Sequence, residues 1–166
     1  MKVEIKNTVS SEAEILSQIQ KAAFKPLYDR YNDEGNPYLR GTDDILKRLN
    51  KENRYFTILY ENNIVGGIFY RLIGKRSPTE ELKEGEYYLA RIYIHPDYQG
   101  LGVARTAIQL CENEFLDAKT YYVDFPVDMD KNRRCYESVG FIDTGETVRW
   151  GNGPLLAMYI KHISNE

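Results

Sequence analysis

The sequence is poor in the residues that hold small proteins together through disulfides or metal ions. It has two cysteines and two histidines among 166 residues. Cys111 and Cys135 lie far apart and show neither CxxC nor Cys/His spacing, so we expect no disulfide framework and no metal site. We expect both thiols to be buried and reduced, as cysteines in protein cores commonly are.

Long apolar runs and a large excess of charge of one sign are also absent. No stretch approaches the length of a membrane span, and residues 1–6 alternate polar and apolar side chains where a signal peptide would be apolar. The 22 Lys and Arg nearly balance the 25 Asp and Glu, and a net charge of -3 gives no long-range attraction for nucleic acid or anionic lipid. We therefore expect a cytoplasmic protein without a nucleic-acid or membrane partner.

The composition is that of a globular protein with a core of its own. Hydrophobic residues make up 42% and charged residues 28% of the chain. No repeat, low-complexity tract or linker interrupts it. We expect a single domain over residues 1–166.

The hydrophobic patterns predict the element order β-α-α-β-β-β-α-β-α-β-β. Strands are expected near residues 3–5, 56–60, 64–72, 87–94, 121–125, 141–150 and 155–163, and helices over 13–24, 42–50, 102–116 and 131–139. The segment 25–41 contains Pro26, Gly35 and Pro37, so we expect a broken helix or a mobile loop there. This order predicts a mixed-sheet α/β fold.

The turn 99–104 lies between a predicted strand and a predicted helix. Free backbone N–H groups at a helix N-terminus carry the positive end of its dipole, and Gly100 and Gly102 leave room for an anion such as a diphosphate. Glycines can also simply satisfy a tight turn. The dinucleotide pattern GxGxxG fails because Arg105 stands at its third glycine, and no P-loop GK[ST] follows.

Two segments carry a resemblance to a known family. Residues 89–104, LARIYIHPDYQGLGVA, resemble the strand, turn and helix of the GNAT superfamily of N-acetyltransferases, with its [Q/R]xxGx[G/A] element. Residues 136–141, YESVGF, resemble the second GNAT signature, a helix ending in Tyr-Glu-x-x-Gly-Phe. The two signatures occur in the order that the family shows.

The resemblance implies a mostly antiparallel mixed sheet flanked by helices, with two splayed central parallel strands at 87–94 and 121–125. It also implies acetyl-CoA as the co-substrate, lying between these strands, with no metal. Its pantetheine would pair with exposed strand backbone. The cofactor-binding residues that the resemblance implies are Ile92, Tyr93, Ile94, Gln99, Gly100, Leu101, Gly102, Val103, Ala104 and Arg105.

Acetyl transfer to an amine needs a neutral amine, stabilisation of the developing oxyanion and a proton for the departing thiolate. By resemblance, the backbone N–H of Ile92 or Ile94 would polarise the thioester carbonyl. The hydroxyl of Tyr136 would act as general acid, although a buried tyrosine can also be a core residue.

Two positions depart from the family pattern. Met129 stands where many members have an Asn that contacts the cofactor, and Asn132 is the nearest substitute. Tyr88 stands about where several members have a basic Glu. The remaining candidates for the base are Asp29, Glu34, Glu86 and Asp124, or ordered water.

The acceptor is expected to be a small-molecule or peptide amine. Tyr28 and Tyr31 belong to an aromatic cluster with Phe24 and Tyr38 that lines the acceptor site or packs on the sheet. Tyr88 and Asp124 complete the expected substrate residues. A catalytically weak CoA-binding sensor of the same fold is the alternative function, and the sequence leaves room for a homodimer.

Overall fold

The computed structural model describes residues 2–164, so the ends of the predicted domain, residues 1 and 165–166, lie outside the described residues. Its strands are β1 (Val3–Asn7), β2 (Asn53–Tyr60), β3 (Asn63–Arg71), β4 (Glu86–Ile94), β5 (Thr120–Pro126), β6 (Ile142–Val148) and β7 (Leu156–His162). Its helices are α1 (Ala13–Tyr31), α2 (Thr42–Arg48), α3 (Val103–Glu112) and α4 (Asp130–Ser138). The predicted order of strands and helices is confirmed.

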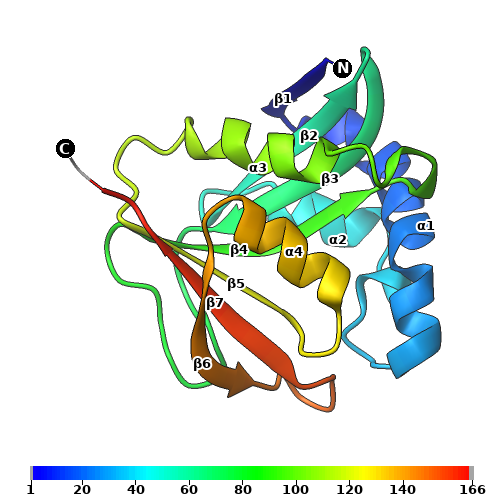
Figure 1. Cartoon of the computed structure of the whole chain (residues 1–166). Helices are drawn as coiled ribbons and strands as arrows, with labels where there is room; N and C mark the ends of the chain where they lie inside the picture. Colours follow the sequence, from blue (N-terminus) through cyan, green and yellow to red (C-terminus); the bar gives the residue numbers. More distant parts are fainter. Residues whose placement is uncertain (1, 165–166) are drawn as a thin grey trace.

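The strands form one seven-stranded sheet in the order β1-β2-β3-β4-β5-β7-β6. Neighbouring strands are antiparallel except β4 and β5, which are parallel. Helices cover both faces of the sheet (Figure 1). The predicted mixed and mostly antiparallel α/β fold is confirmed. Within residues 2–164, no helix combines the length and the apolar character that a membrane span requires.

Side chains that alternate along β2 separate the core into two layers. Phe56 packs with Ala107 of α3 on one face, whereas Tyr55 packs with Leu16 of α1 and Ile45 of α2 on the other. Successive residues of a strand point to opposite faces, so one side of β2 meets α3 and the other meets α1 and α2. The site described below lies where these two layers meet, at the middle of the sheet.

The prediction of a broken helix or loop over 25–41 is wrong for its first part, because α1 continues through Pro26 to Tyr31. Proline removes one helical hydrogen bond, but the following turn is held by tertiary contacts. Tyr28 stacks on Tyr38 with ring centroids 5.1 Å apart. The helix ends at Tyr31 and is capped by Asn32, which has a left-handed backbone (φ 50°) and donates its N–H to the Tyr28 carbonyl at 2.7 Å.

The parallel pair β4 and β5 separates after a short paired stretch. Only Glu86–Tyr88 of β4 pair with Thr120–Tyr122 of β5. Beyond them, residues 89–94 and 123–126 diverge, while each strand stays paired with its antiparallel neighbour. The predicted pair of splayed central parallel strands is therefore confirmed.

A β-bulge interrupts β4 just after the strands separate. Leu89 pairs with Tyr70 and Arg91 pairs with Phe69, so Ala90 has no partner on β3. One extra residue reverses the alternation of side chains from that point on. As a result, Arg91 faces α2, where it contacts Asp44 at 3.0 Å.

Candidate active site

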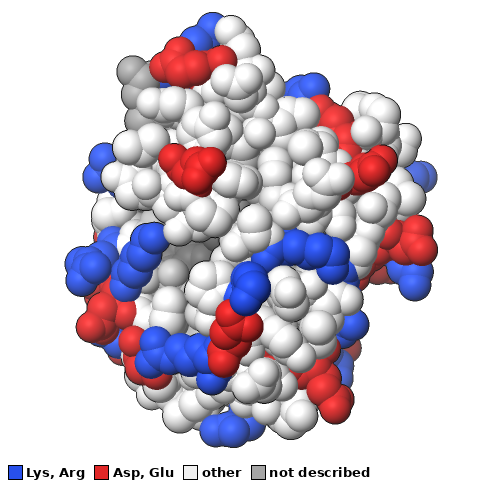
Figure 2. Space-filling view, turned by 90° about the vertical axis from the view of Figure 1, so that its right-hand side faces the viewer, with Lys and Arg blue, Asp and Glu red and all other residues white. Residues whose placement is uncertain are grey.

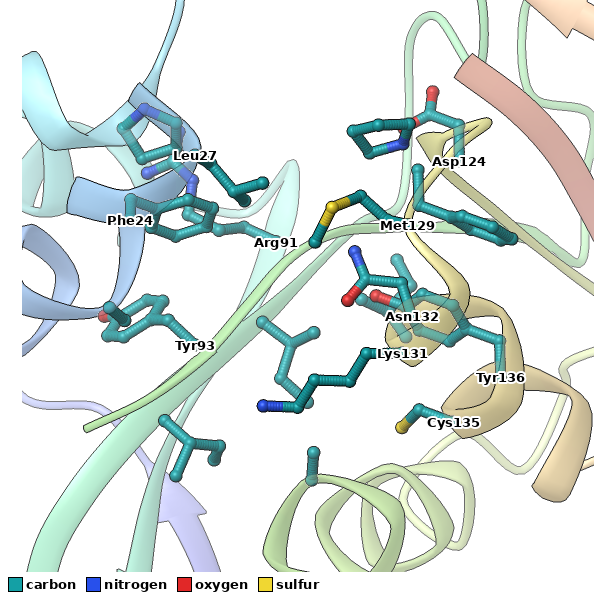
Figure 3. Close-up of a pocket in the computed structure, with 18 of the residues that line it drawn as sticks. Phe24, Leu27, Arg91, Tyr93, Asp124, Met129, Lys131, Asn132, Cys135 and Tyr136 are labelled. Carbon is teal, nitrogen blue, oxygen red and sulfur yellow. The ribbon is translucent and has the colours of Figure 1, made fainter. Parts of the chain in front are cut away.

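A cavity of about 1020 Å³ opens where β4 and β5 separate. Phe24 and Leu27 of α1 lie on one side of it and Asn132 and Tyr136 of α4 on the other (Figure 3). The expected site residues that line it are Tyr31, Tyr88, Ile92, Tyr93, Ile94, Gln99, Gly100, Gly102, Val103, Ala104, Arg105, Asp124, Asn132 and Tyr136. Leu101 and Tyr28, which are both described, do not line it.

The backbone of β4 presents hydrogen-bond donors to the gap. The N–H of His95 donates to the carbonyl of Val65 in β3 at 2.8 Å, and Gly66 pairs with Ile94. In an antiparallel ladder this pattern turns the N–H and C=O groups of Ile94 and Ile92 away from β3. They face the space that β5 has left, and the side chain of Gln99 donates to the Ile94 carbonyl there at 2.8 Å.

The N-terminus of α3 forms one end of the cavity. Gly102 is its N-cap with φ 81°, and the first helical hydrogen bond runs from the Thr106 N–H to the Gly102 carbonyl at 3.1 Å. The N–H groups of residues 103–105 therefore have no partner within the helix. Arg105 in the first turn of α3 also lines the cavity, and Lys131 reaches this end, where its Nζ donates to the Gln99 side chain at 3.2 Å. Free N–H groups, the helix dipole and these cations together favour a phosphate-bearing ligand.

Tyr136 projects from α4 into the cavity (Figure 3). Only 7% of the residue is exposed, and its ring stacks on Phe125 with centroids 5.4 Å apart. Burial raises the pKa of Tyr136 well above its usual range. The hydroxyl therefore stays protonated at neutral pH and can donate a proton.

Asp124 is the candidate base that the structure brings into the cavity. Its carboxylate accepts hydrogen bonds of 3.0 Å from the Tyr88 hydroxyl and from Nε1 of Trp150. Burial raises the pKa of Asp124, and the Trp150 and Tyr88 donors oppose that shift. Tyr88 is the last β4 residue paired with β5, so the pair lies where the strands separate.

The other candidate bases lie elsewhere. Asp29 forms a surface ion pair with Lys25 at 2.7 Å. Glu86 accepts a hydrogen bond from the Tyr122 hydroxyl at 3.1 Å. Neither of them, nor Glu34, lines the cavity.

The aromatic cluster expected over the acceptor site divides in two. Phe24 and Tyr31 line the cavity, whereas Tyr28 and Tyr38 stack on each other outside it. The expectation that both cysteines are buried is correct for Cys111. It is wrong for Cys135, which is partly exposed and lines the cavity.

Trp150, Arg71 and Arg91 are among the cavity residues that no sequence motif predicted. Trp150 follows β6, and Arg71 ends β3 with its guanidinium carbon 5.4 Å from the centroid of the Tyr88 ring. Arg91 lies within the strand motif, but no local signal showed which face it occupies. All three line the cavity because segments far apart in the sequence pack together, and no local sequence pattern predicts such packing.

Comparison with known proteins identifies the family. The family model described as Acetyltransferase (GNAT) family matches residues 16–141. The chain therefore belongs to the GNAT family of acetyltransferases, and the predicted class of enzyme is confirmed. No curated protein matches the chain significantly.

Several solved structures share the fold over nearly the whole chain. PaiA N-acetyltransferase from Thermoplasma acidophilum, solved with coenzyme A, is 14% identical with a TM-score of 0.75 and covers 98% of this chain and 100% of its own. The ribosomal-protein-S18-alanine N-acetyltransferase from Escherichia coli is 14% identical with a TM-score of 0.74, at coverages of 99% and 96%. AAC(6')-Ib, solved with ribostamycin and coenzyme A, is 11% identical with a TM-score of 0.77, at coverages of 98% and 94%.

Proposed function

We propose that this protein transfers an acetyl group from acetyl-CoA directly to an amine. The observation that carries the proposal is the gap between β4 and β5, into which the N–H groups of Ile92 and Ile94 and the hydroxyl of Tyr136 are directed. The backbone N–H donors of β4 and the hydroxyl of α4 therefore line the same gap as the partly buried carboxylate of Asp124.

The residues at the gap fit acetyl-CoA in shape and charge. Strand backbone at Ile92–Ile94 suits the amides of pantetheine, since an extended chain can pair with an exposed strand edge. The N–H groups after Gly102, together with Arg105 and Lys131, suit the diphosphate. Bound acetyl-CoA would supply an activated acyl group. The coenzyme A in the Thermoplasma structure supports this assignment.

The proton path is assigned to two side chains. Asp124 accepts the proton that the amine must lose, directly or through one water, and its raised pKa brings its basicity closer to neutrality. Tyr136 donates a proton toward the sulfur, since burial keeps its hydroxyl protonated. The N–H of Ile92 or Ile94 stabilises negative charge on the acyl oxygen.

A panel of amines tests the proposal against the sensor alternative. The purified protein is incubated with acetyl-CoA and amino acids, peptides, polyamines or aminoglycosides, and the release of free CoA is followed with a thiol reagent. We expect release that depends on at least one class of amine. Tight acetyl-CoA binding without amine-dependent release across the panel would indicate a sensor.

A further inference from the structure

We propose that the acceptor carries an acidic group near its amine, as an amino acid does, and that Arg71 binds this acidic group while Asp124 holds the amine. The inference rests on the proposed function, since it concerns the acceptor end of the same cavity. It narrows the acceptor to a zwitterionic or acidic amine.

Arg71 has hydrogen-bond donors to spare. It donates one bond to the Lys75 carbonyl at 2.7 Å, and its guanidinium lies over the ring of Tyr88. Guanidinium carries five N–H donors in a planar fork that matches a carboxylate. Among residues 2–164, no carboxylate oxygen lies within 4.0 Å of it. It lines the cavity and also a smaller polar pocket beside it.

Asp124 lies at the hydroxyl end of Tyr88, the tyrosine whose ring Arg71 covers. The Tyr88 hydroxyl donates to both of its oxygens at 3.0 Å, while Arg71 stacks on the ring. The two charges are close enough for Arg71 to lower the pKa of Asp124, but they form no ion pair. One aromatic ring thus separates a free cation from a carboxylate, and a zwitterion could engage both.

The remaining charges at this end argue against a polycationic acceptor. The basic residues that line it are Arg30, Arg48, Arg71 and Arg91. They are balanced by Asp33 and Asp124, which line the cavity, and by Asp44 and Asp128, which contact three of these arginines. Figure 2 shows Lys and Arg side chains, together with some Asp and Glu, near a hollow on the face that it presents. A polyamine or an aminoglycoside would need carboxylates in excess, because like charges repel in a partly desolvated site.

The partners of these arginines leave Arg71 as the cation available to a ligand. Arg48 and Arg91 both contact Asp44, at 3.3 and 3.0 Å. Arg30 contacts Asp128 at 2.5 Å. Because these three already face carboxylates within the protein, Arg71 is the residue that an incoming acidic group can pair with.

The test compares acceptors that differ only in the acidic group. The kcat/KM is measured for common amino acids, their carboxamides and the corresponding decarboxylated amines. We expect the acid to be preferred over its carboxamide by about 10- to 100-fold, the range for a lost hydrogen bond to a charged group. Arg71→Gln should abolish this preference, because it should lower the kcat/KM for the acid and leave that for the carboxamide unchanged.

Arg40→Gln is the matched control, because Arg40 is exposed, does not line the cavity and also donates to a backbone carbonyl, that of Glu34. It should keep the preference for the acid. Equal use of acid and carboxamide by the wild type would overturn the inference without any variant. An equal loss for both acceptors in a folded Arg71→Gln protein would show a structural role for Arg71 and overturn it as well.

The two proposals fail in different ways. Amine-dependent CoA release without a preference for acids would contradict only the acidic acceptor. Absence of release with every amine, despite a rise in melting temperature with acetyl-CoA, would contradict the proposed function and the inference with it.

Discussion

The hydroxyl of Tyr31 donates a hydrogen bond of 2.5 Å to Asp128, joining the last turn of α1 to the segment between β5 and α4. Arg30 contacts the other carboxylate oxygen at 2.5 Å. We call Arg30, Tyr31 and Asp128 the clasp. Burial, followed by the Asp128 bond, raises the pKa of Tyr31 to about 12, and the same bond lowers the pKa of Asp128. The clasp therefore stays intact at neutral pH.

Loss of the clasp should loosen the acceptor end of the cavity, because Arg30 and Tyr31 line it. We expect Tyr31→Phe to raise the KM for the amine severalfold while kcat changes less, and Asp128→Asn to do the same. Steady-state kinetics of both variants and of the double variant measure this. Because Asp128 also contacts Arg30, the double variant should resemble Asp128→Asn alone, and additive effects would contradict a shared role of Tyr31 and Asp128.

Gly102→Glu should abolish the rise in melting temperature caused by acetyl-CoA. The new carboxylate would repel a diphosphate at the N-terminus of α3. Gly145→Glu is the matched control, since Gly145 has φ 82° against 81° for Gly102, and an added Cβ would meet nothing within 4 Å. It carries the same backbone strain and the same charge on β6. A Gly102→Glu protein that binds CoA as the wild type does would refute the assigned phosphate site.

Tyr136→Phe should lower kcat while keeping the fold and most of the acetyl-CoA affinity, since it removes only the hydroxyl. Loss of a general acid costs about 10²- to 10⁴-fold, and we expect the lower end because a thiolate is a good leaving group. The matched control is Tyr70→Phe, whose buried hydroxyl has no hydrogen-bond partner within the described residues. Single-turnover kinetics report on the chemical step, and a rate within about twofold of wild type would exclude Tyr136 from it.

The pH dependence of kcat/KM should report on Asp124. Only its ionised form accepts a proton, so activity should fall as the pH drops through its pKa, which burial raises above the ordinary 3.8. Trp150→Phe removes a donor that stabilises the ionised form, so the pKa should rise further and the acidic limb should move to higher pH. The same amine is used with the wild type and with Trp150→Phe, so that protonation of the amine affects both pH profiles equally.

An acidic limb that does not move in Trp150→Phe would contradict this role. Asp124→Asn gives an independent check, because it should remove the limb and lower kcat by about 10²-fold or more if Asp124 is the base. A smaller loss would favour ordered water as the proton acceptor.

The sequence predicted the parts of the site that depend on neighbouring residues. The turn at Gln99–Arg105 and the position of Tyr136 follow from short motifs, and their local structure matches the expectation. Strands and helices were found because their apolar residues repeat with the period of each element.

The parts that the sequence did not predict depend on contacts between distant segments. Pro26 indicated a helix end, but the turn after it is held by Tyr38 and Asp128. Trp150 and Tyr88 both reach Asp124 although they come from separate strands or loops. Neither contact has a local pattern, because each depends on the order of strands in the sheet.

The bulge at Ala90 decides which face each later residue of β4 occupies. If Ala90 paired with Phe69 in a regular ladder, Arg91 would turn toward the apolar layer under α3 and Ile92 toward α2. The backbone donors of the strand would exchange sides with them, away from the gap. Deleting Ala90 should instead leave the packing and the site in place, because Leu89 already pairs with Tyr70 and Arg91 with Phe69, which are consecutive residues of β3.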